Sequence, residues 1–285
     1  MQSIQIYIAN RLYFVYNAHM AFDIRKGNYT FKHSRSFEEP DNETGSFREH
    51  FHSLYELLYF IGGEADYKIR HTRYSLKPHT LLVVKPGELH HVLIKSAEAP
   101  YERFVVRFDE SDLPGGLRKL IRRLDSVYSI KDTPLSEEFF RLDGFRETLP
   151  DEEAVFYAMR WHLNIILTYL CVSQDLRLKA DVVNRDVHQI TDYIEQHLTD
   201  IHTMEDLCTG LHMSRSGLHK IFSTGFDMPV MRYVRTQKVT LAHTLLNDGY
   251  PPTEIPARCG FNDYSSFYRA YRELYRTSPS GSSRR

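Results

Sequence analysis

Near the C-terminus, residues 252–271 have the pattern of a short helix, a tight turn and a second helix. Thr253 is placed to cap the first helix, and Pro256 falls in its first turn, where proline is tolerated. Gly260 supplies the positive φ that ends this helix, and Asp263 is the N-cap expected for the next. Two helices joined this tightly favour a helix-turn-helix, whose second helix enters the DNA major groove.

The second helix of this unit has two distinct faces. Phe267 and Tyr271 are four residues apart, which predicts that both point toward a core. The residues left on the outer side are Tyr264, Ser265, Tyr268, Arg269 and Arg272. A polar and cationic outer face is the one that a recognition helix presents to DNA.

The same pattern occurs fifty residues earlier in the chain. Thr203 and Asp206 have a spacing that resembles a capping box, and residues 211–214 form the turn. A second helix follows from Ser214 to Phe222, with Leu218 inward. Two units of this kind indicate a pair of DNA readers in one chain.

A connecting helix is expected between the two units, from Val230 to Leu246. It is long enough to fix the spacing of the two readers. The apolar residues expected on its one inward face are Val230, Tyr233, Val234, Leu241 and Leu245.

Over about residues 187–284 the chain resembles the AraC/XylS family of bacterial transcription regulators. Many motif positions fall in order over two copies, so the resemblance is specific. The matching residues are Tyr233, Lys238, Ala242, Leu245, Leu246, Glu254, Ile255, Cys259, Gly260, Phe261, Asp263, Ser265, Phe267, Arg269, Tyr271, Ser278 and Pro279. Asp227 and Arg276 replace the usual glycine after each recognition helix, so the helix before Arg276 could run on and tilt out of the groove. Pro256 replaces a small residue, and Ser282 a tyrosine.

The resemblance also implies which side chains contact DNA. The base-reading positions of the family correspond here to Ser216, His219, Lys220, Tyr264, Ser265 and Arg269. Asn262 is expected on the same surface, and Arg215 and Arg272 are expected to contact phosphates, which position a protein without reading sequence. Arg269 can pair with guanine through two hydrogen bonds, which discriminates against a wrong base by ~1–3 kcal/mol.

The N-terminal part of the chain has a β-type pattern instead. Short apolar runs recur between Gly and Pro turns, which favours an antiparallel sandwich or barrel. A strand is also expected within residues 1–24, where isoleucines alternate. The other expected strands are Leu54–Ile61, Ala65–Arg70, Thr80–Val84, His91–Lys95 and Arg103–Phe108.

Histidines in this region resemble the two signature motifs of cupins, which are small jelly-roll barrels also found as sensor domains in the AraC/XylS family. The order is Gly45-x4-His50-x-His52-x3-Glu56-x6-Gly63, followed by Pro86-Gly87-x2-His90. His50 and His52 alternate along one strand and therefore share a face, together with Glu56, and His90 comes from a neighbouring strand.

Three interpretations of these four residues stay open. Imidazoles with one carboxylate suit Zn, Fe, Mn or Ni and leave positions for a substrate. The same residues can instead be hydrogen-bonded groups near the barrel mouth, or they can contact a small polar effector directly. The spacing from Gly45 to His50 is one residue shorter than the usual motif.

Helices are expected between the barrel and the DNA-binding units, at Leu117–Leu124, Ser136–Phe145 and Asp151 to about Leu178. The long helix has two apolar stripes. The first consists of Val155, Met159, Leu163, Ile166 and Leu170, and the second of Trp161, Ile165 and Tyr169. A helix that is apolar on two sides is buried on two sides. One side is expected on the barrel, and the other against a second subunit or elsewhere in the same chain.

A length of 285 residues favours more than one domain. We expect an α+β multidomain fold: a cupin/jelly-roll barrel at residues 1–112, a helical linker and dimerisation region at 113–183, and an all-α double helix-turn-helix domain at 184–285. The net charge is −1, but residues 215–285 carry 11 Lys and Arg against five Asp and Glu. A basic C-terminal end fits contact with phosphates.

The sequence therefore predicts a cytoplasmic, homodimeric, sequence-specific regulator whose partners are double-stranded DNA, a small polar metabolite (a sugar is the family-level example) and RNA polymerase. No cofactor is required, although the barrel histidines allow a divalent metal. No membrane partner is expected, because the longest apolar stretch, 165–172, is too short to span a bilayer. The rival interpretations are a metal-dependent cupin isomerase or dioxygenase, and a helical interaction module without DNA.

Overall fold

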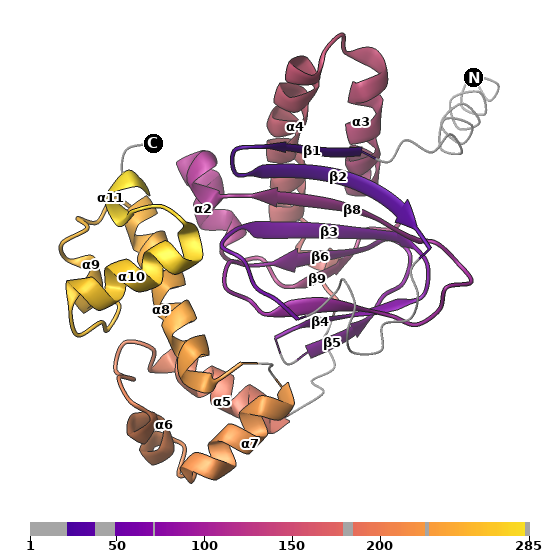
Figure 1. Cartoon of the computed structure of the whole chain (residues 1–285). Coiled ribbons are helices and arrows are strands. Elements are labelled where there is room, and N and C mark those ends of the chain that lie inside the picture. Colours follow the sequence, from indigo (N-terminus) through magenta and orange to yellow (C-terminus); the bar gives the residue numbers. More distant parts are fainter. Residues whose placement is uncertain (1–21, 38–48, 71, 179–184, 226–227, 283–285) are drawn as a thin grey trace.

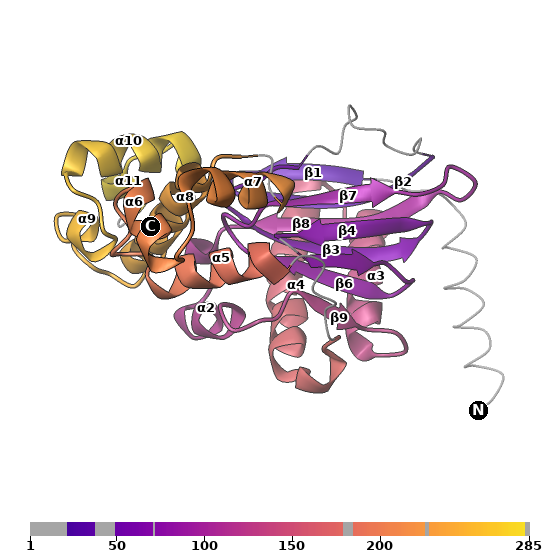
Figure 2. The same cartoon turned by 90° about the horizontal axis from the view of Figure 1, so that it is seen from below.

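The computed structural model describes residues 22–37, 49–70, 72–178, 185–225 and 228–282. A β-barrel carries two helices on one face, and a helical domain lies beside one end of its strands (Figures 1 and 2). A strand was expected within residues 1–24, and its alternating isoleucines at 4, 6 and 8 lie outside the described residues. The glycine at 45, the aspartate at 227 and the segment 179–184 also lie outside them.

Nine strands form two antiparallel sheets within the described part of the chain, as expected for a cupin-like barrel. The larger sheet has the order β1-β2-β8-β3-β6-β9 and the smaller the order β5-β4-β7. The strands are β1 (Phe22–Lys26), β2 (Tyr29–Ser36), β3 (Tyr55–Gly62), β4 (Ala65–Ile69), β5 (Thr72–Ser75), β6 (Thr80–Val84), β7 (His90–Ile94), β8 (Tyr101–Phe108) and β9 (Val127–Ser129).

Strand β3 is buried on both faces, as its continuous apolar run predicts. Leu57 and Tyr59 pack in the core between the larger sheet and the helices behind it. Leu58 and Phe60 pack in a second core that joins the two sheets. Side chains alternate along a strand, so Glu56 belongs with Leu58 and Phe60 on the inside of the barrel.

Three helices follow the barrel strands: α2 (Gly115–Ile121), α3 (Pro134–Thr148) and α4 (Glu152–Val172). The first expected stripe of α4 is confirmed, since Val155, Met159, Leu163, Ile166 and Leu170 are all buried. Helix α4 ends at Val172 rather than near Leu178, because Ser173 leaves the helical conformation and a 3-10 turn, η2 (Gln174–Leu176), follows.

Helix α4 is also long and apolar enough to cross a membrane, and no other helix in the described ranges is. Half of its most apolar stretch is buried inside the protein, in the core that it forms with the larger sheet. That burial is the behaviour of a core helix in a folded domain.

The helical domain contains α5 (Arg185–Gln196), α6 (Met204–Gly210), α7 (Arg215–Gly225), α8 (Val230–Asn247), α9 (Ile255–Arg258), α10 (Tyr264–Tyr275) and α11 (Pro279–Ser282). The helix caps and the turn glycine predicted for this domain are largely confirmed. Thr203 and Asp206 form the capping box, Asp263 caps α10 through the backbone N–H of Ser266, and Gly260 has a φ of +68°.

Thr253 does not cap α9, contrary to the expectation. Glu254 occupies the N-cap position with near-helical angles (φ −88°, ψ −22°) and makes no side-chain cap bond. The carboxylate of Glu254 instead accepts hydrogen bonds from Arg258, one turn later. Pro256 does fall in the first turn, as expected.

Helix α10 does not run on past Arg276. Arg276 itself adopts the left-handed conformation that the family glycine normally supplies, with a φ of 56°. A left-handed L-residue costs roughly 1–2 kcal/mol, which the surrounding packing offsets. The recognition helix therefore ends where the family pattern places its end.

Helix α8 is buried more widely than expected. Val230, Tyr233 and Val234 are buried, but Leu241 and Leu245 are only partly buried. Val239, Ala242 and Leu246 fill the core in their place, because α8 packs against both helix-turn-helix units and against the barrel.

Candidate DNA-binding surface and effector site

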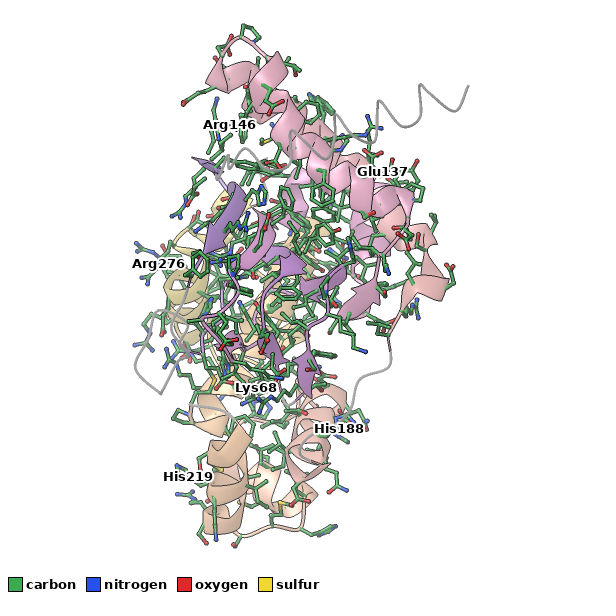
Figure 3. The ribbon with its side chains drawn as sticks, turned by 90° about the vertical axis from the view of Figure 1, so that its right-hand side faces the viewer. Lys68, Glu137, Arg146, His188, His219 and Arg276 are labelled. Atoms are coloured by element: carbon green, nitrogen blue, oxygen red, sulfur yellow. The ribbon has the colours of Figure 1, made fainter. Side chains whose placement is uncertain are left out.

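The expected DNA-contacting residues lie on the outer sides of α7 and α10, apart from Asn262 in the turn before α10. The exposed ones are Arg215, Ser216, His219, Lys220, Asn262, Tyr264, Ser265, Arg269 and Arg272. In Figure 3, His219 on α7 lies at the end of the molecule opposite Arg146 and Glu137, clear of the barrel. Leu218 and Phe222 on α7, and Phe267 and Tyr271 on α10, hold the other faces in the cores.

The two arginines expected to contact phosphates have neighbours in the absence of DNA. The guanidinium of Arg215 is 2.5 Å from the carboxylate of Glu205 in an exposed pair. The guanidinium of Arg272 lies 5.9 Å from the ring centroid of Tyr268. Exposed pairs are worth little, so both side chains are free to turn toward a phosphate.

Lys238 on α8 joins the two helix-turn-helix units. Its buried ammonium donates hydrogen bonds to the carbonyl of Ile201, before α6, at 2.7 Å and to the carbonyl of Gly260, in the second turn, at 2.6 Å. A Cβ at position 260 would lie 2.0 Å from the carbonyl oxygen of Thr199, so only glycine fits there. The sequence pattern marked Lys238 as a family position without assigning this role to it.

The barrel histidines come together as predicted. Side-chain ligand atoms of His50, His52 and His90 all lie within 4.8 Å of one another. The expectation that His50 and His52 share a regular strand is wrong, because β3 starts only at Tyr55. His50 is placed instead by an isolated bridge, in which its N–H and C=O exchange hydrogen bonds with those of His90.

Glu56 lies against this cluster but is engaged elsewhere. One carboxylate oxygen accepts a hydrogen bond from the Arg107 guanidinium at 2.5 Å and lies 3.2 Å from Nε2 of His52. The other oxygen accepts from the Tyr67 hydroxyl at 3.2 Å. Burial raises the pKa of Glu56, but the contacts with His52 and Arg107 outweigh it and hold that pKa well below its usual range.

His90 is the most buried member of the cluster. Its Nδ1 lies 2.8 Å from the carbonyl oxygen of Glu88, and its Nε2 is buried without a hydrogen-bond partner in the described residues. Burial lowers the pKa of His90 to about 3, so the ring is neutral at pH 7. A neutral imidazole with one nitrogen already bonded has its second lone pair available.

A cavity of about 480 Å³ lies between the barrel and the helical domain. His50 and His52 line it from the barrel, and Arg232, Arg235 and Arg276 line it from α8 and the end of α10. This volume falls within the range of small-molecule sites. The effector residues expected from the sequence are therefore next to the DNA-binding domain, which the sequence pattern did not reveal.

Two apolar side chains of the barrel pack into the DNA-binding domain beside this cavity. Leu89 is 3% exposed and belongs to the core of α5, α7 and α8, and Phe51 packs against the same core. A Cβ at Gly87 would lie 2.6 Å from the hydroxyl oxygen of Thr240 on α8, so the barrel loop approaches that helix closely. The segments that carry the cupin-like motif therefore also form the surface on which the DNA-binding domain packs.

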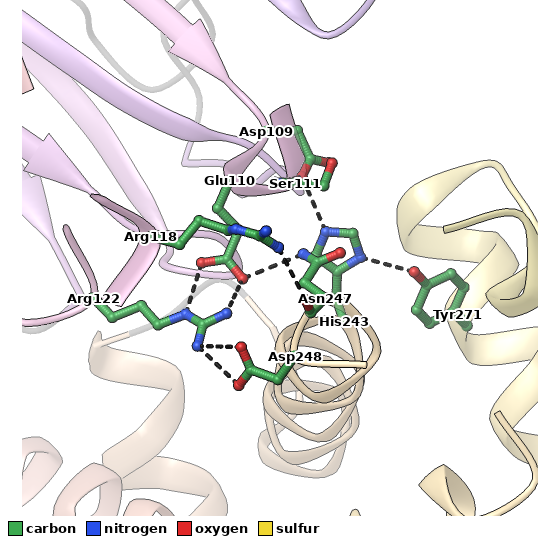
Figure 4. Close-up of polar contacts among 9 residues, drawn as sticks. All are labelled: Asp109, Glu110, Ser111, Arg118, Arg122, His243, Asn247, Asp248 and Tyr271. Atoms are coloured by element: carbon green, nitrogen blue, oxygen red, sulfur yellow. Dashed lines mark hydrogen bonds and ion pairs between the residues drawn. The ribbon is translucent and has the colours of Figure 1, made fainter. Parts of the chain in front are cut away.

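A polar contact cluster joins the domains on a second side (Figure 4). Arg122 after α2 binds Glu110 at 2.7 Å and both carboxylate oxygens of Asp248 at 3.0 Å. His243 lies 3.2 Å from Asp109, and Arg118 donates to the carbonyl of Asn247. These partners are far apart in the sequence, so no local pattern could have paired them.

Two family models match the chain. An AraC-like ligand-binding domain matches residues 35–142, and a helix-turn-helix domain matches residues 207–285. The chain is 22% identical over 257 residues to the HTH-type transcriptional activator RhaS of Salmonella schwarzengrund, covering 85% of this chain and 89% of RhaS. It is 31% identical over 91 residues to "Probable transcriptional regulator LumQ" of Photobacterium leiognathi, covering 32% of this chain and 37% of LumQ.

Solved structures of related regulators align at low similarity. The crystal structure of ToxT from Vibrio cholerae is 15% identical, with a TM-score of 0.36 over 90% of this chain and 97% of ToxT. An AraC family regulator from Rhodopseudomonas palustris is 27% identical, with a TM-score of 0.32 over 35% of this chain and 95% of that one.

A ligand-binding barrel joined to two helix-turn-helix units defines a one-component transcription regulator. The chain belongs to the AraC/XylS family. It is a DNA-binding transcription regulator with a small-molecule sensor domain.

Proposed function

We propose that α7 and α10 read two successive major-groove segments on one face of DNA. The observation that carries this is the position of Lys238, which bonds both units from the single helix between them. Readers held by one helix are expected to contact segments about one helical turn, ~10 bp, apart. The residues that contact bases in this proposal are Ser216, His219, Lys220, Tyr264, Ser265 and Arg269. Asn262 lies on the same surface, and Arg215 and Arg272 contact phosphates.

Hydroxyl-radical footprinting on a DNA fragment selected from genomic DNA tests this proposal. We expect two protected segments one turn apart on the same face. Protection of a single short segment would show that only one unit reads DNA. The genes beside the selected fragment also indicate the effector.

We propose that the effector is a small polar metabolite, with sugars and sugar acids as the first class to test. Polar and cationic groups line the cavity between the domains, where His50 and His52 face Arg232 and Arg235. Glu56 and His90 contact His52 from inside the barrel. A thermal-shift screen of sugars and sugar acids tests the identity of the effector, because a ligand that binds only the folded state raises the unfolding temperature. A hit that is equally strong for the Arg232→Ala variant would place the ligand elsewhere.

We propose a homodimer formed through the second stripe of α4. Trp161 is 72% exposed, Ile165 46% and Tyr169 40%, on the side of α4 opposite its buried stripe. These residues repeat every four positions and form one apolar ridge. A second copy of the same helix offers a matching ridge, as the two-fold symmetry of most homodimers requires.

We propose the division into residues 1–112, 113–183 and 184–285 for sensor, helical and DNA-binding parts. The helices of the middle part pack on the larger sheet and present the dimerisation ridge outward. A regulator of this design acts in the cytoplasm without catalysis, and we propose activation through contact with RNA polymerase, as the activator name of the RhaS relative suggests. Transcription from a promoter carrying the selected site, with and without the effector, tests the sign of regulation.

A further inference from the structure

The two helix-turn-helix units have separate buried cores. The core of α5, α7 and α8 includes Phe222 and Tyr233, and the core of α8, α9 and α10 includes Phe267 and Tyr271. Helix α8 contributes to both cores, and Lys238 forms hydrogen bonds with both units. Helices packed on a shared helix can still slide relative to each other. A third body that contacts both units would therefore fix their separation more tightly.

The barrel reaches the first unit through Arg70, in the turn between β4 and β5. The guanidinium of Arg70 binds the carboxylate of Glu195 on α5 and contacts the hydroxyl of Tyr233 on α8. Burial raises the pKa of Tyr233 to about 12, and the contact with Arg70 acts in the opposite direction. The ring centroid of Tyr233 lies 5.6 Å from that of Phe222 on α7, so Arg70 contacts the residue that backs the first recognition helix.

Arg70 has a backbone conformation that residues with side chains rarely adopt. Its φ is 56°, in the left-handed region. Its backbone N–H donates to the carbonyl of Leu89 at 2.7 Å, and Leu89 packs in the core of the first unit. Residues held in this region are often found at functional positions. Here the conformation belongs to the residue that carries a charge from the barrel to the DNA-binding domain.

A residue of opposite charge makes the equivalent contact with the second unit. Asp109, after β8, lies 3.2 Å from the imidazole of His243 on α8. The other nitrogen of that ring lies 2.8 Å from the hydroxyl of Tyr271 on α10 (Figure 4). All three side chains are buried. The barrel therefore has one polar contact behind each recognition helix, through Arg70 for α7 and through Asp109 for α10.

We propose that the barrel fixes the distance between the two DNA segments that the chain recognises, with Arg70 and Asp109 as the residues that position α7 and α10. Both residues belong to one folded barrel, so a movement of α7 relative to α10 strains or breaks one of the two contacts. DNA whose segments lie at the matching distance binds a preorganised pair of helices, and DNA with another spacing does not. This inference rests on the proposed function, because it requires that both helices read DNA.

Binding to DNA sites of different spacing tests the proposal. One base pair inserted between the two protected segments moves them apart by about 3.4 Å and rotates one relative to the other by about 34–36°. The unaltered chain should bind this site at least about tenfold more weakly, a loss comparable with that of one base contact. Arg70→Ala and Asp109→Ser should each lose about threefold or less, because the loosened unit can follow its segment. Serine keeps the N-cap that Asp109 provides to η1 (Glu110–Asp112) but is too short to reach His243.

The ratio of the affinities for the two sites separates loosening from unfolding. Partial unfolding weakens binding to both DNAs alike, so it leaves the ratio unchanged. Glu195→Gln removes the charged partner of Arg70 from the α5 side, at a side chain that is 49% exposed, and should also lower the ratio. Arg25→Ala, which breaks an exposed ion pair with Asp23 on β1, is the matched control and should keep the ratio of the unaltered chain.

Two results would overturn the proposal. The first is an unaltered chain that binds the two spacings with affinities within about threefold of each other. The second is a ratio that stays at its full value in Arg70→Ala, Asp109→Ser and Glu195→Gln alike. A footprint of one short segment on the original DNA would instead contradict the proposed function, before any spacing is varied.

Discussion

The imidazole of His243 on α8 lies 3.2 Å from the carboxylate of Asp109 at the end of β8, while its other nitrogen lies 2.8 Å from the hydroxyl of Tyr271 on α10. One side chain thus touches the sensor barrel and the second recognition helix together (Figure 4). All three residues are buried or nearly so. Docking of the barrel is therefore linked by direct contact to α10, the second proposed recognition helix.

Loss of the neighbouring ion pair should loosen this docking. Asp248→Ala removes a carboxylate that binds Arg122 at 3.0 Å, in a pair that is partly exposed. We expect a loss of about 0.5–1 kcal/mol, seen as a two- to fivefold faster hydrogen exchange at residues 109–112. Glu254→Ala, which breaks an exposed pair with Arg258, is the control. Unchanged exchange at 109–112 would show that this contact does not hold the domains.

Lys238→Met should uncouple the two DNA readers. The carbonyls of Ile201 and Gly260 would lose their buried donor, at a cost of about 1–3 kcal/mol each. The midpoint of urea unfolding should fall, and the footprint should shorten to one segment. Lys131→Met, at an exposed position, should change neither. A variant of unchanged stability that still protects both segments would show that Lys238 does not couple the two helix-turn-helix units.

The stability of the barrel should fall as the pH rises above neutral because of His33. Burial lowers the pKa of His33, but hydrogen bonds to Asp143 and Glu102 outweigh burial and raise it to about 9. The protonated ring stabilises the fold fully below pH 6.5, its unfolded value, and this stabilisation is lost as the pH rises through 9. The difference of about 2.5 pH units corresponds to roughly 3 kcal/mol.

Urea unfolding at pH 6 and at pH 9.5 measures this loss. His33→Gln should be less stable at pH 6 and should not show the fall in stability toward pH 9.5. His188→Gln, whose side chain is about 41% exposed, should retain the slope of the unaltered chain. An equal slope in the His33 variant would assign the pH dependence to other groups.

Charged residues on the exposed stripe of α4 should give monomers. Ile165→Glu with Tyr169→Glu places two charges on the apolar ridge without touching the buried stripe. Light scattering should report half the mass of the unaltered chain, with the same circular dichroism. Leu178→Glu, at a residue 44% exposed beyond the end of α4, is the control. A double variant of unchanged mass excludes this interface.

Local signals allowed much of the fold to be predicted. Caps, turn glycines and i, i+4 apolar pairs act within a few residues, so the units around Asp263 and Thr203 were placed correctly. The short strands β5 and β9 were missed, because each is stabilised mainly by a partner strand.

Some contacts at the barrel histidines and between the domains could not be predicted from the sequence, because they join residues that are far apart in the chain. The sequence pattern correctly predicted that His50, His52 and Glu56 lie close together, although His50 and His52 precede the strand that carries Glu56. The pairing of Glu56 with Arg107 depends on the register of β3 against β8. The contact of Asp109 with His243 joins residues 134 positions apart. Such contacts follow from the docking of whole domains, which no local pattern encodes.

The most direct test of the two-reader account compares Arg269→Ala with Lys220→Ala on selected and on scrambled DNA over a range of salt. Arg269 is exposed on α10, away from the buried Phe267 and Tyr271, and should face base edges. Its loss should cost ~1–3 kcal/mol on the selected DNA and relax sequence preference there. Loss of Lys220, if its ammonium binds a phosphate, should weaken both DNAs alike and lower the salt slope by about one unit. Equal losses on both DNAs for Arg269→Ala would contradict base reading by α10.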